Sequence, residues 1–360
     1  MSDSPPPASV AAPTYFRPWV GFALSITLFG LFLLDIGLGS VAIPPKQVLK
    51  ILLGVSSDSL AWVNIVEQIR LPKAVTAVLA GAALSVGGLQ MQTLFRNPLA
   101  GPSVLGITSG ASLGVALVTL GTGSTLTTYA IQTIGLSQGW LVVLAATSGA
   151  ALVLLIILWI SFRVGDYVVL LIVGLMVGNI TLSLVGIWQY FSRPEQIQNY
   201  VLWTLGSLHS VTPHHLPILL SVIGGGIVLS FLSSKGLNAL LLGENYATSL
   251  GLSLIRARTL ISVATSLLAG AVTGFCGPIG FVGIAVPHLT RSLLNTSDHF
   301  VLIPAVSVLG AIIMLFCDIV SQLPGHQATL PINAVTALIG SPVVIWIILR
   351  RNSAGQTRGK

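Results

Sequence analysis

Apolar segments of helical length follow one another along almost the whole chain, and polar or turn-rich breaks separate them. Each is close to the ~20 residues that an α-helix needs to cross the hydrocarbon core of a membrane. The pattern therefore predicts an all-α polytopic membrane protein with about ten transmembrane helices. The expected segments are 19–38, 74–95, 103–120, 138–162, 167–190, 214–233, 257–275, 278–294, 300–320 and 331–349.

The composition excludes an ordinary soluble domain. Hydrophobic residues make up 54% of the chain and charged residues only 7%, whereas soluble domains carry about 25% charged residues. The 38 glycines favour helices over a β-barrel, because small residues let spanning helices approach closely. Cys276 and Cys317 stand in apolar context, which favours packing thiols and leaves a disulfide between them as an alternative.

The positions of the lysines and arginines predict how the helices are oriented in the membrane. If all ten segments cross and the N-terminus is cytoplasmic, 11 of the 16 basic residues fall on the cytoplasmic side, in agreement with the positive-inside tendency. We expect a disordered cytoplasmic region at 1–17, a ten-span domain at 18–351 and a cytoplasmic tail at 352–360. The basic residues stand at the ends of apolar segments, so the net charge of +7 does not indicate nucleic-acid binding.

A cytoplasmic stretch from Leu237 to Leu260 differs from the apolar segments on either side of it. Its leucines recur at helical spacing as far as Gly243, and a second short amphipathic pattern opens at Glu244 and ends at Gly251. We expect two short helices with glycine corners. Such helices fit a groove on a partner protein or lie on lipid headgroups, and the pattern alone leaves both interpretations open.

The acidic residues and the known phosphate-binding sequences limit how transport is driven. None of the nine acidic residues falls in the middle of an expected span, whereas carriers driven by ion gradients usually need a carboxylate at that depth. The chain also lacks the G-x-x-x-x-G-K-[ST] sequence that cradles ATP phosphates. We expect no catalytic residues, no cofactor and no metal site. An ion-driven secondary carrier stays an alternative, as does a passive channel with polar pore residues.

Two stretches contain polar residues that close helix packing does not explain. One runs from Arg96 to Pro102, and the other runs from Gly277 to Arg291 and includes His288. At these residues the chain resembles the permease subunits of ABC importers for iron complexes and cobalamin, the FecCD-type family, and the similarity covers nearly the whole chain. Further matching motifs are Arg70-Leu71-Pro72-Lys73, Gly206-Ser207-Leu208, Gly243-Glu244, Leu330-Pro331-Ile332 and Gly340-Ser341-Pro342.

The resemblance implies the type II ABC importer permease fold in a bacterial inner membrane. It also implies a second permease subunit, two separate ATP-binding cassette ATPase subunits and a periplasmic or lipid-anchored substrate-binding protein. The cytoplasmic loop 237–256 becomes the element that docks on the ATPase. The implied sites are ATPase coupling at Gly243, Glu244, Tyr246, Ala247, Leu250 and Gly251, binding-protein docking at Arg70 and Lys73, and a cytoplasmic gate at Asn97, Pro98 and Leu99.

The expected substrate is an iron(III)–siderophore or a related iron complex, with cobalamin and heme as alternatives in the same family. Asn179, Thr181 and Ser183 of the fifth expected span are candidates to line the pathway. We expect small Ala247 to lie where the coupling helix approaches the ATPase most closely. Family members usually carry an arginine where this chain has Gln322, so one docking charge is missing here. The sequence does not distinguish a dimer of identical chains from a heterodimer.

Overall fold

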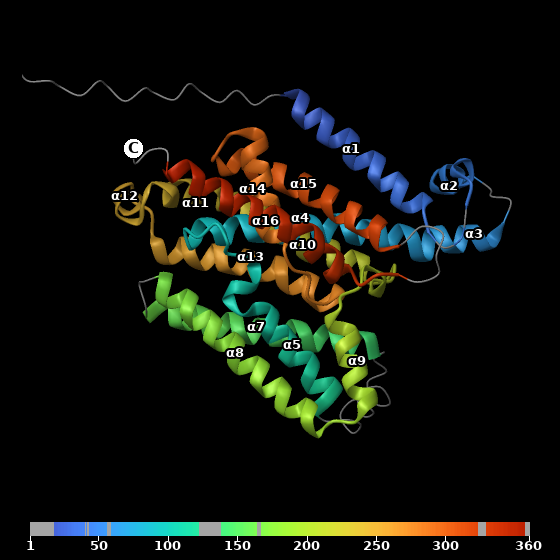
Figure 1. Ribbon diagram of the computed structural model, residues 1–360, viewed down its shortest axis with the longest axis horizontal. Coiled ribbons are helices and arrows are strands. Elements are labelled where there is room, and N and C mark those ends of the chain that lie inside the picture. Colours follow the sequence, from blue (N-terminus) through green and yellow to red (C-terminus); the bar gives the residue numbers. More distant parts are fainter. Residues whose placement is uncertain are drawn as a thin grey trace, which may run out of the picture.

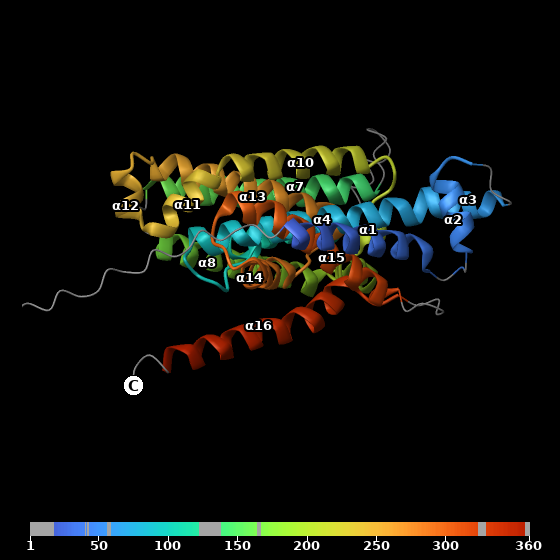
Figure 2. The same cartoon turned by 90° about the horizontal axis from the view of Figure 1, so that it is seen from above.

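The computed structural model describes residues 18–39, 41, 43–55, 59–121, 138–163, 167–322 and 329–356. Within these residues the chain is a bundle of helices that run roughly side by side (Figures 1 and 2). The region 1–17 and residues 357–360 of the expected tail lie outside the described residues. The remaining part of that tail continues the last helix, which ends at Gln356.

Every apolar segment expected from the sequence has a helical counterpart. In the described part of the chain, six helices are long and apolar enough to cross a membrane, and α10 and α11 meet the same criterion only together, across a bend of 47°. The counterparts are α1 (Pro18–Gly37), α4 (Leu71–Leu94), α5 (Ile107–Ala116), α7 (Gln138–Arg163), α8 (Tyr167–Phe191), α10 (Leu216–Leu232), α13 (Leu254–Cys276), α14 (Val282–Leu294), α15 (His299–Ser321) and α16 (Ile332–Gln356).

Four of the ten expected segments differ from an unbroken span. Helix α10 bends into α11 (Ser234–Leu242), while α5, α14 and the apolar part of α16 are shorter than a full crossing. Backbone corners explain two of these cases. Gly106 precedes α5 with φ +72°, and Phe281 precedes α14 with φ +66°. Each of these segments therefore begins with a turn that uses part of its apolar length.

Helix α4 occupies the centre of the bundle and packs against α10, α13, α14 and α15. Together with α3 (Leu60–Ile65) and a π-helical turn (Val66–Arg70), it forms a helical run of 35 residues. Because this exceeds the ~20 residues of a crossing, the run projects past its neighbours beside α2 (Pro45–Leu52) (Figure 1). We call this the α2 end, and the opposite end, which carries α12 (Glu244–Ser249), the α12 end.

Glycines bring α4 into backbone contact with two neighbouring helices. A Cβ atom at Gly81 would lie 2.2 Å from the carbonyl oxygen of Gly310 in α15, and one at Gly88 would lie 1.8 Å from that of Gly283 in α14. Lipid tails are as apolar as the helices, so close packing of small residues is a main source of helix association in membranes. The glycines therefore determine how α14 and α15 sit on α4.

The two cysteines are buried and free. Cys276 ends α13 and Cys317 lies in the last turns of α15. They behave as small apolar side chains in the interior, as a packing role requires. The disulfide alternative does not apply.

The glycine contact makes a stability prediction. Gly81→Ala should lower the unfolding free energy of the detergent-solubilised protein by about 1–3 kcal/mol, because the added methyl group forces α15 away from α4. Gly225→Ala in α10 is the matched control, since a Cβ atom there meets nothing within 4 Å. Equal melting temperatures for the two variants in a thermal size-exclusion assay would contradict the close packing of α4 on α15.

Candidate coupling, gate and charge-cluster sites

Two short helices, α11 and α12, form the loop at the α12 end and meet at Gly243, which has φ +117°. Gly251 follows α12 with φ +84°. Both conformations favour glycine, because a Cβ atom is strained there. The two helices and their glycine corners agree with the sequence prediction. Ser253 stands at the N-cap of α13, but its side chain caps no backbone N–H group.

Of the three apolar side chains that the sequence pattern assigned to the ATPase contact, only two are exposed on α12 and the residue that follows it. Tyr246 is 54% exposed and Leu250 is 62% exposed, so both are available to a partner. Ala247 is fully buried within this chain. Its carbonyl oxygen accepts a hydrogen bond from the N–H of Leu252, 3.0 Å away, where the chain folds back toward α13. The expectation that Ala247 contacts the ATPase is therefore corrected: a large side chain there would disrupt the loop itself.

An ion pair attaches α12 to α13. The Arg258 guanidinium donates to the Glu244 carboxylate at 2.7 Å, and the arginine side chain is buried while the glutamate is partly exposed. Such a charge-assisted bond has a defined direction and length. Glu244, expected as a coupling residue, thus holds α12 against α13.

The expected gate residues form a turn that other helices hold in place. The Asn97 side-chain oxygen accepts from the N–H of Leu99 at 2.9 Å, and His288 of α14 contacts the carbonyl oxygen of Pro98, also at 2.9 Å. Arg96 has φ +47° and donates to the carbonyl oxygen of Leu240 in α11 at 3.1 Å. The structure therefore brings the gate turn and the coupling loop together, although they are far apart in the sequence.

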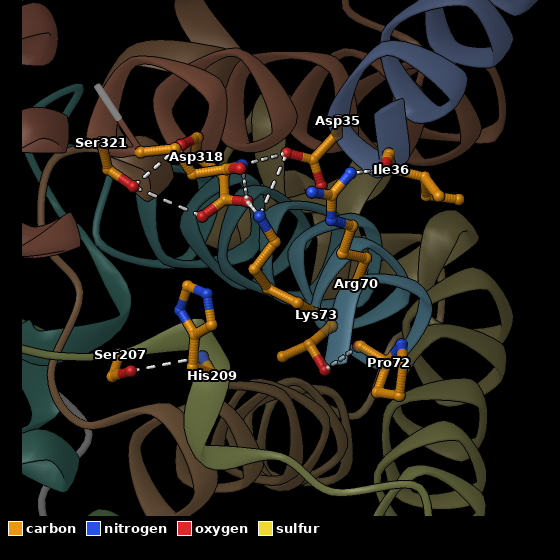
Figure 3. A network of polar contacts seen from close by, with 11 residues as sticks. Asp35, Ile36, Arg70, Pro72, Lys73, Ser207, His209, Asp318 and Ser321 are labelled. Atoms are coloured by element: carbon orange, nitrogen blue, oxygen red, sulfur yellow. Dashed lines mark hydrogen bonds and ion pairs between the residues drawn. The ribbon is translucent and has the colours of Figure 1, made fainter. Parts of the chain in front are cut away.

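A buried charge cluster lies at the α2 end, where α1, α4 and α15 meet (Figure 3). Lys73 lies 2.7 Å from an Asp318 carboxylate oxygen and 3.5 Å from one of Asp35. Gln322 donates to Asp35 at 2.7 Å and to Asp318 at 3.1 Å. All four side chains are buried. The sequence analysis did not predict this cluster, because its members lie far apart along the chain.

Arg70 holds the end of α1 beside this cluster. It is buried, and its guanidinium donates to the carbonyl oxygens of Ile36 at 3.0 Å, Gly37 at 2.9 Å and Val41. Arg70 and Lys73 therefore present no free charge to a binding protein, which is at odds with their expected docking role. The lysines that are exposed on described elements at this end are Lys46 and Lys50 of α2.

The His209 imidazole faces Lys73 from the segment that precedes α10 (Figure 3). Part of its surface stays exposed. The pKa of His209 lies below its ordinary value, mainly because surrounding protein atoms displace the water that would stabilise a charged imidazole. The positive charge of Lys73 also lowers this pKa, whereas the carboxylate of Asp318 raises it. A neutral imidazole adds no further positive charge to the cluster.

The three candidate pathway residues of α8 do not share a face. Asn179 and Ser183 are exposed one turn apart, and the Ser183 hydroxyl donates to the Asn179 carbonyl oxygen at 3.0 Å. Thr181 is buried against its own chain. Thr181 is therefore removed from the expected lining, because on a helix a residue two positions from Asn179 points to a different side.

The comparisons with known proteins agree with the fold. The FecCD transport family matches residues 26–350. The chain belongs to this family. The family's members are permeases of ABC importers, so the ion-driven carrier and passive channel alternatives no longer apply. The family also implies an ATPase, a substrate-binding protein and a second permease subunit.

Two FecCD relatives carry the same description. The vitamin B12 import system permease protein BtuC of Klebsiella pneumoniae subsp. pneumoniae is 36% identical over 342 residues, which are 94% of this chain and 96% of that protein. BtuC of Salmonella typhimurium is 37% identical over 284 residues, 79% and 83% of the two chains. A solved structure, described as an inward-facing metal-chelate type ABC transporter, covers 93% of this chain and 100% of its own with a TM-score of 0.80 at 26% identity.

The charge cluster of this FecCD permease makes a second prediction. Lys73→Met should lower the unfolding free energy by about 3–5 kcal/mol, because it leaves two buried carboxylates without their cation. Lys46→Met, at an exposed position of α2, is the control and should change stability little. Urea unfolding in detergent measures both. A Lys73→Met variant as stable as the parent but weaker in binding-protein association would instead support the docking role.

Proposed function

We propose that this FecCD permease is the membrane-spanning subunit of an ATP-driven importer for a metal chelate, with cobalamin as the first candidate. The observation that carries the proposal is the 36% identity to a vitamin B12 permease across 94% of the chain. A ferric siderophore, which the resemblance led us to expect, is the second candidate, because the solved relative is described only as a metal-chelate type transporter.

The proposed importer contains two permease subunits and two ATPase subunits, and the α12 end faces the ATPases in the cytoplasm. The exposed Tyr246 and Leu250 enter a groove on the ATPase as apolar anchors, in the way that amphipathic helices commonly bind. The permease performs no chemistry on its substrate. A periplasmic or lipid-anchored binding protein delivers the substrate at the α2 end.

Closure of the ATPases moves α12, and the contacts of this loop carry the movement into the permease. The Glu244–Arg258 ion pair takes the displacement to α13, and the bond from Arg96 to Leu240 takes it from α11 to the gate turn. A small movement of a packed element is enough to switch a helical bundle between two discrete arrangements. The turn at Asn97, Pro98 and Leu99 then opens or closes the cytoplasmic end of the pathway.

Substrate uptake tests the proposed function. Deleting the gene should abolish uptake of radiolabelled cyanocobalamin by intact cells, and the cloned permease should restore it. Uptake of a radiolabelled ferric siderophore, ferrichrome, measured in the same strains, tests the second candidate. A deletion strain that takes up both compounds at the parental rate would contradict the metal-chelate assignment.

The coupling contact makes a separate prediction. The double variant Tyr246→Ala, Leu250→Ala should fold and insert normally, because both side chains are exposed, yet lose the ATPase during purification. Leu53→Ala, at a residue that is 70% exposed at the α2 end, is the matched control and should keep it. Full ATPase stoichiometry in the double variant would contradict the proposed coupling contact and support the alternative in which these side chains lie on lipid headgroups.

A further inference from the structure

Asn238 of α11 makes three hydrogen bonds to the start of α15. Its side-chain nitrogen donates to the Asp298 carboxylate at 2.7 Å. Its side-chain oxygen accepts from the backbone N–H of His299 at 2.9 Å and lies 2.7 Å from the imidazole Nδ1. A carboxylate only accepts, so the amide nitrogen must face Asp298 and the oxygen must face His299. Nδ1 of His299 therefore carries a proton.

The other side of the same imidazole reaches α4. His299 Nε2 lies 2.9 Å from the Thr93 hydroxyl, and both side chains are buried. With the proton of a neutral ring on Nδ1, Nε2 can only accept, so in this bridge the single proton of the Thr93 hydroxyl points to Nε2. The carbonyl oxygen of Leu89, 3.0 Å from the same hydroxyl oxygen, is the competing acceptor. The resulting chain of contacts, Asn238–His299–Thr93, joins α11, α15 and α4, and we call it the polar bridge.

The polar bridge connects a loop element to two helices that are in backbone contact. Helices α4 and α15 are in backbone contact at Gly81 and Gly310, so they move as a pair. Helix α11 lies between α10 and the coupling helix α12, with a bend of 47° between α10 and α11, and it packs on both α4 and α15. Any displacement of α12 that passes along α11 meets this pair at the bridge.

We propose that Asn238, His299 and Thr93 are positioning residues that transmit the movement of the coupling loop to the α4–α15 pair. The proposal rests on the proposed function of α12 as the ATPase-docking helix. Apolar contacts of α11, such as those of buried Leu237, resist compression but allow sliding. Hydrogen bonds of fixed length and direction resist sliding as well, and the buried contact between His299 and Thr93 is costly to leave unmade. The bridge therefore carries both the forward and the return movement.

The isosteric pair Thr93→Val and Thr93→Ser isolates the bridge from packing. Valine keeps the volume and removes the hydroxyl, whereas serine keeps the hydroxyl; Asn238→Ala removes the α11 side of the bridge. A reporter cysteine, Val320→Cys, is placed at the partly exposed α2 end of α15, in a chain whose two native thiols are buried. The complex of permease and ATPase is reconstituted in proteoliposomes, and reaction of the reporter with a maleimide is timed without nucleotide and after trapping with ATP and vanadate.

In the parent and in Thr93→Ser, trapping should change the labelling rate of the reporter. In Thr93→Val and Asn238→Ala this response should fall at least about fivefold, the lower range of ordinary coupling between sites, while ATPase binding and ATP hydrolysis persist. A parental response in Thr93→Val would overturn the transmission role, as would a response that falls only in proportion to the amount of folded complex. If Asn238→Ala does not fold, the threonine pair decides alone.

The same experiment separates failure of the bridge from failure of the proposed function. A parent permease that retains no ATPase and gives no response to trapping would overturn the proposed function, and the transmission role with it. A parent that responds normally while all variants also respond would overturn the bridge alone. Hydrolysis per bound ATPase, measured in each sample, distinguishes loss of transmission from loss of the ATPase.

Discussion

At Gly81 and Gly310 the backbones of α4 and α15 lie so close that neither position has room for a Cβ atom. This contact fixes how far one helix is shifted along the other. Lys73 stands eight residues before Gly81, and Asp318 stands eight residues after Gly310, so the antiparallel helices bring the two charges together at the α2 end. Thr93 lies twelve residues after Gly81, and His299 lies eleven residues before Gly310, so these two side chains meet at the α12 end. A shift of one turn would separate both pairs.

Polar groups at the two ends of this helix pair have different consequences. At the α2 end, burial and pairing make Lys73 an internal fastening for α1 and α15, and the side chain of Gln322 donates one further bond to each carboxylate. Ionisable groups within a membrane bundle persist when they pair with one another. At the α12 end of the pair, hydrogen bonds join Thr93, His299 and Asn238, and the carboxylate among their partners, that of Asp298, is exposed to solvent and not buried.

The α12 end also explains the polar residues that helix packing alone did not. Asn97 closes its own turn, His288 holds the carbonyl oxygen of Pro98, and Arg291 donates to the Gln92 side chain at 2.7 Å. The coupling loop contacts this region through Leu240 and through Asn238. An importer that is driven from outside its membrane domain requires such connections, because a ligand or partner shifts a conformational equilibrium only through contacts that differ between the two states.

The sequence by itself determined the helical class, the approximate positions of the ten expected apolar helices, and the short helices with corners at Gly243 and Gly251, because these depend on local periodicity and on backbone conformations that glycine favours. Its motifs also identified the family. Only the tertiary structure decided which side chains face a partner: Ala247 and Thr181 are turned inward, and Arg70 and Lys73 are occupied by groups of their own chain. The same holds for the charge cluster and the polar bridge. Their members lie as many as 287 residues apart, and no local pattern specifies which helices will pack together or at what register.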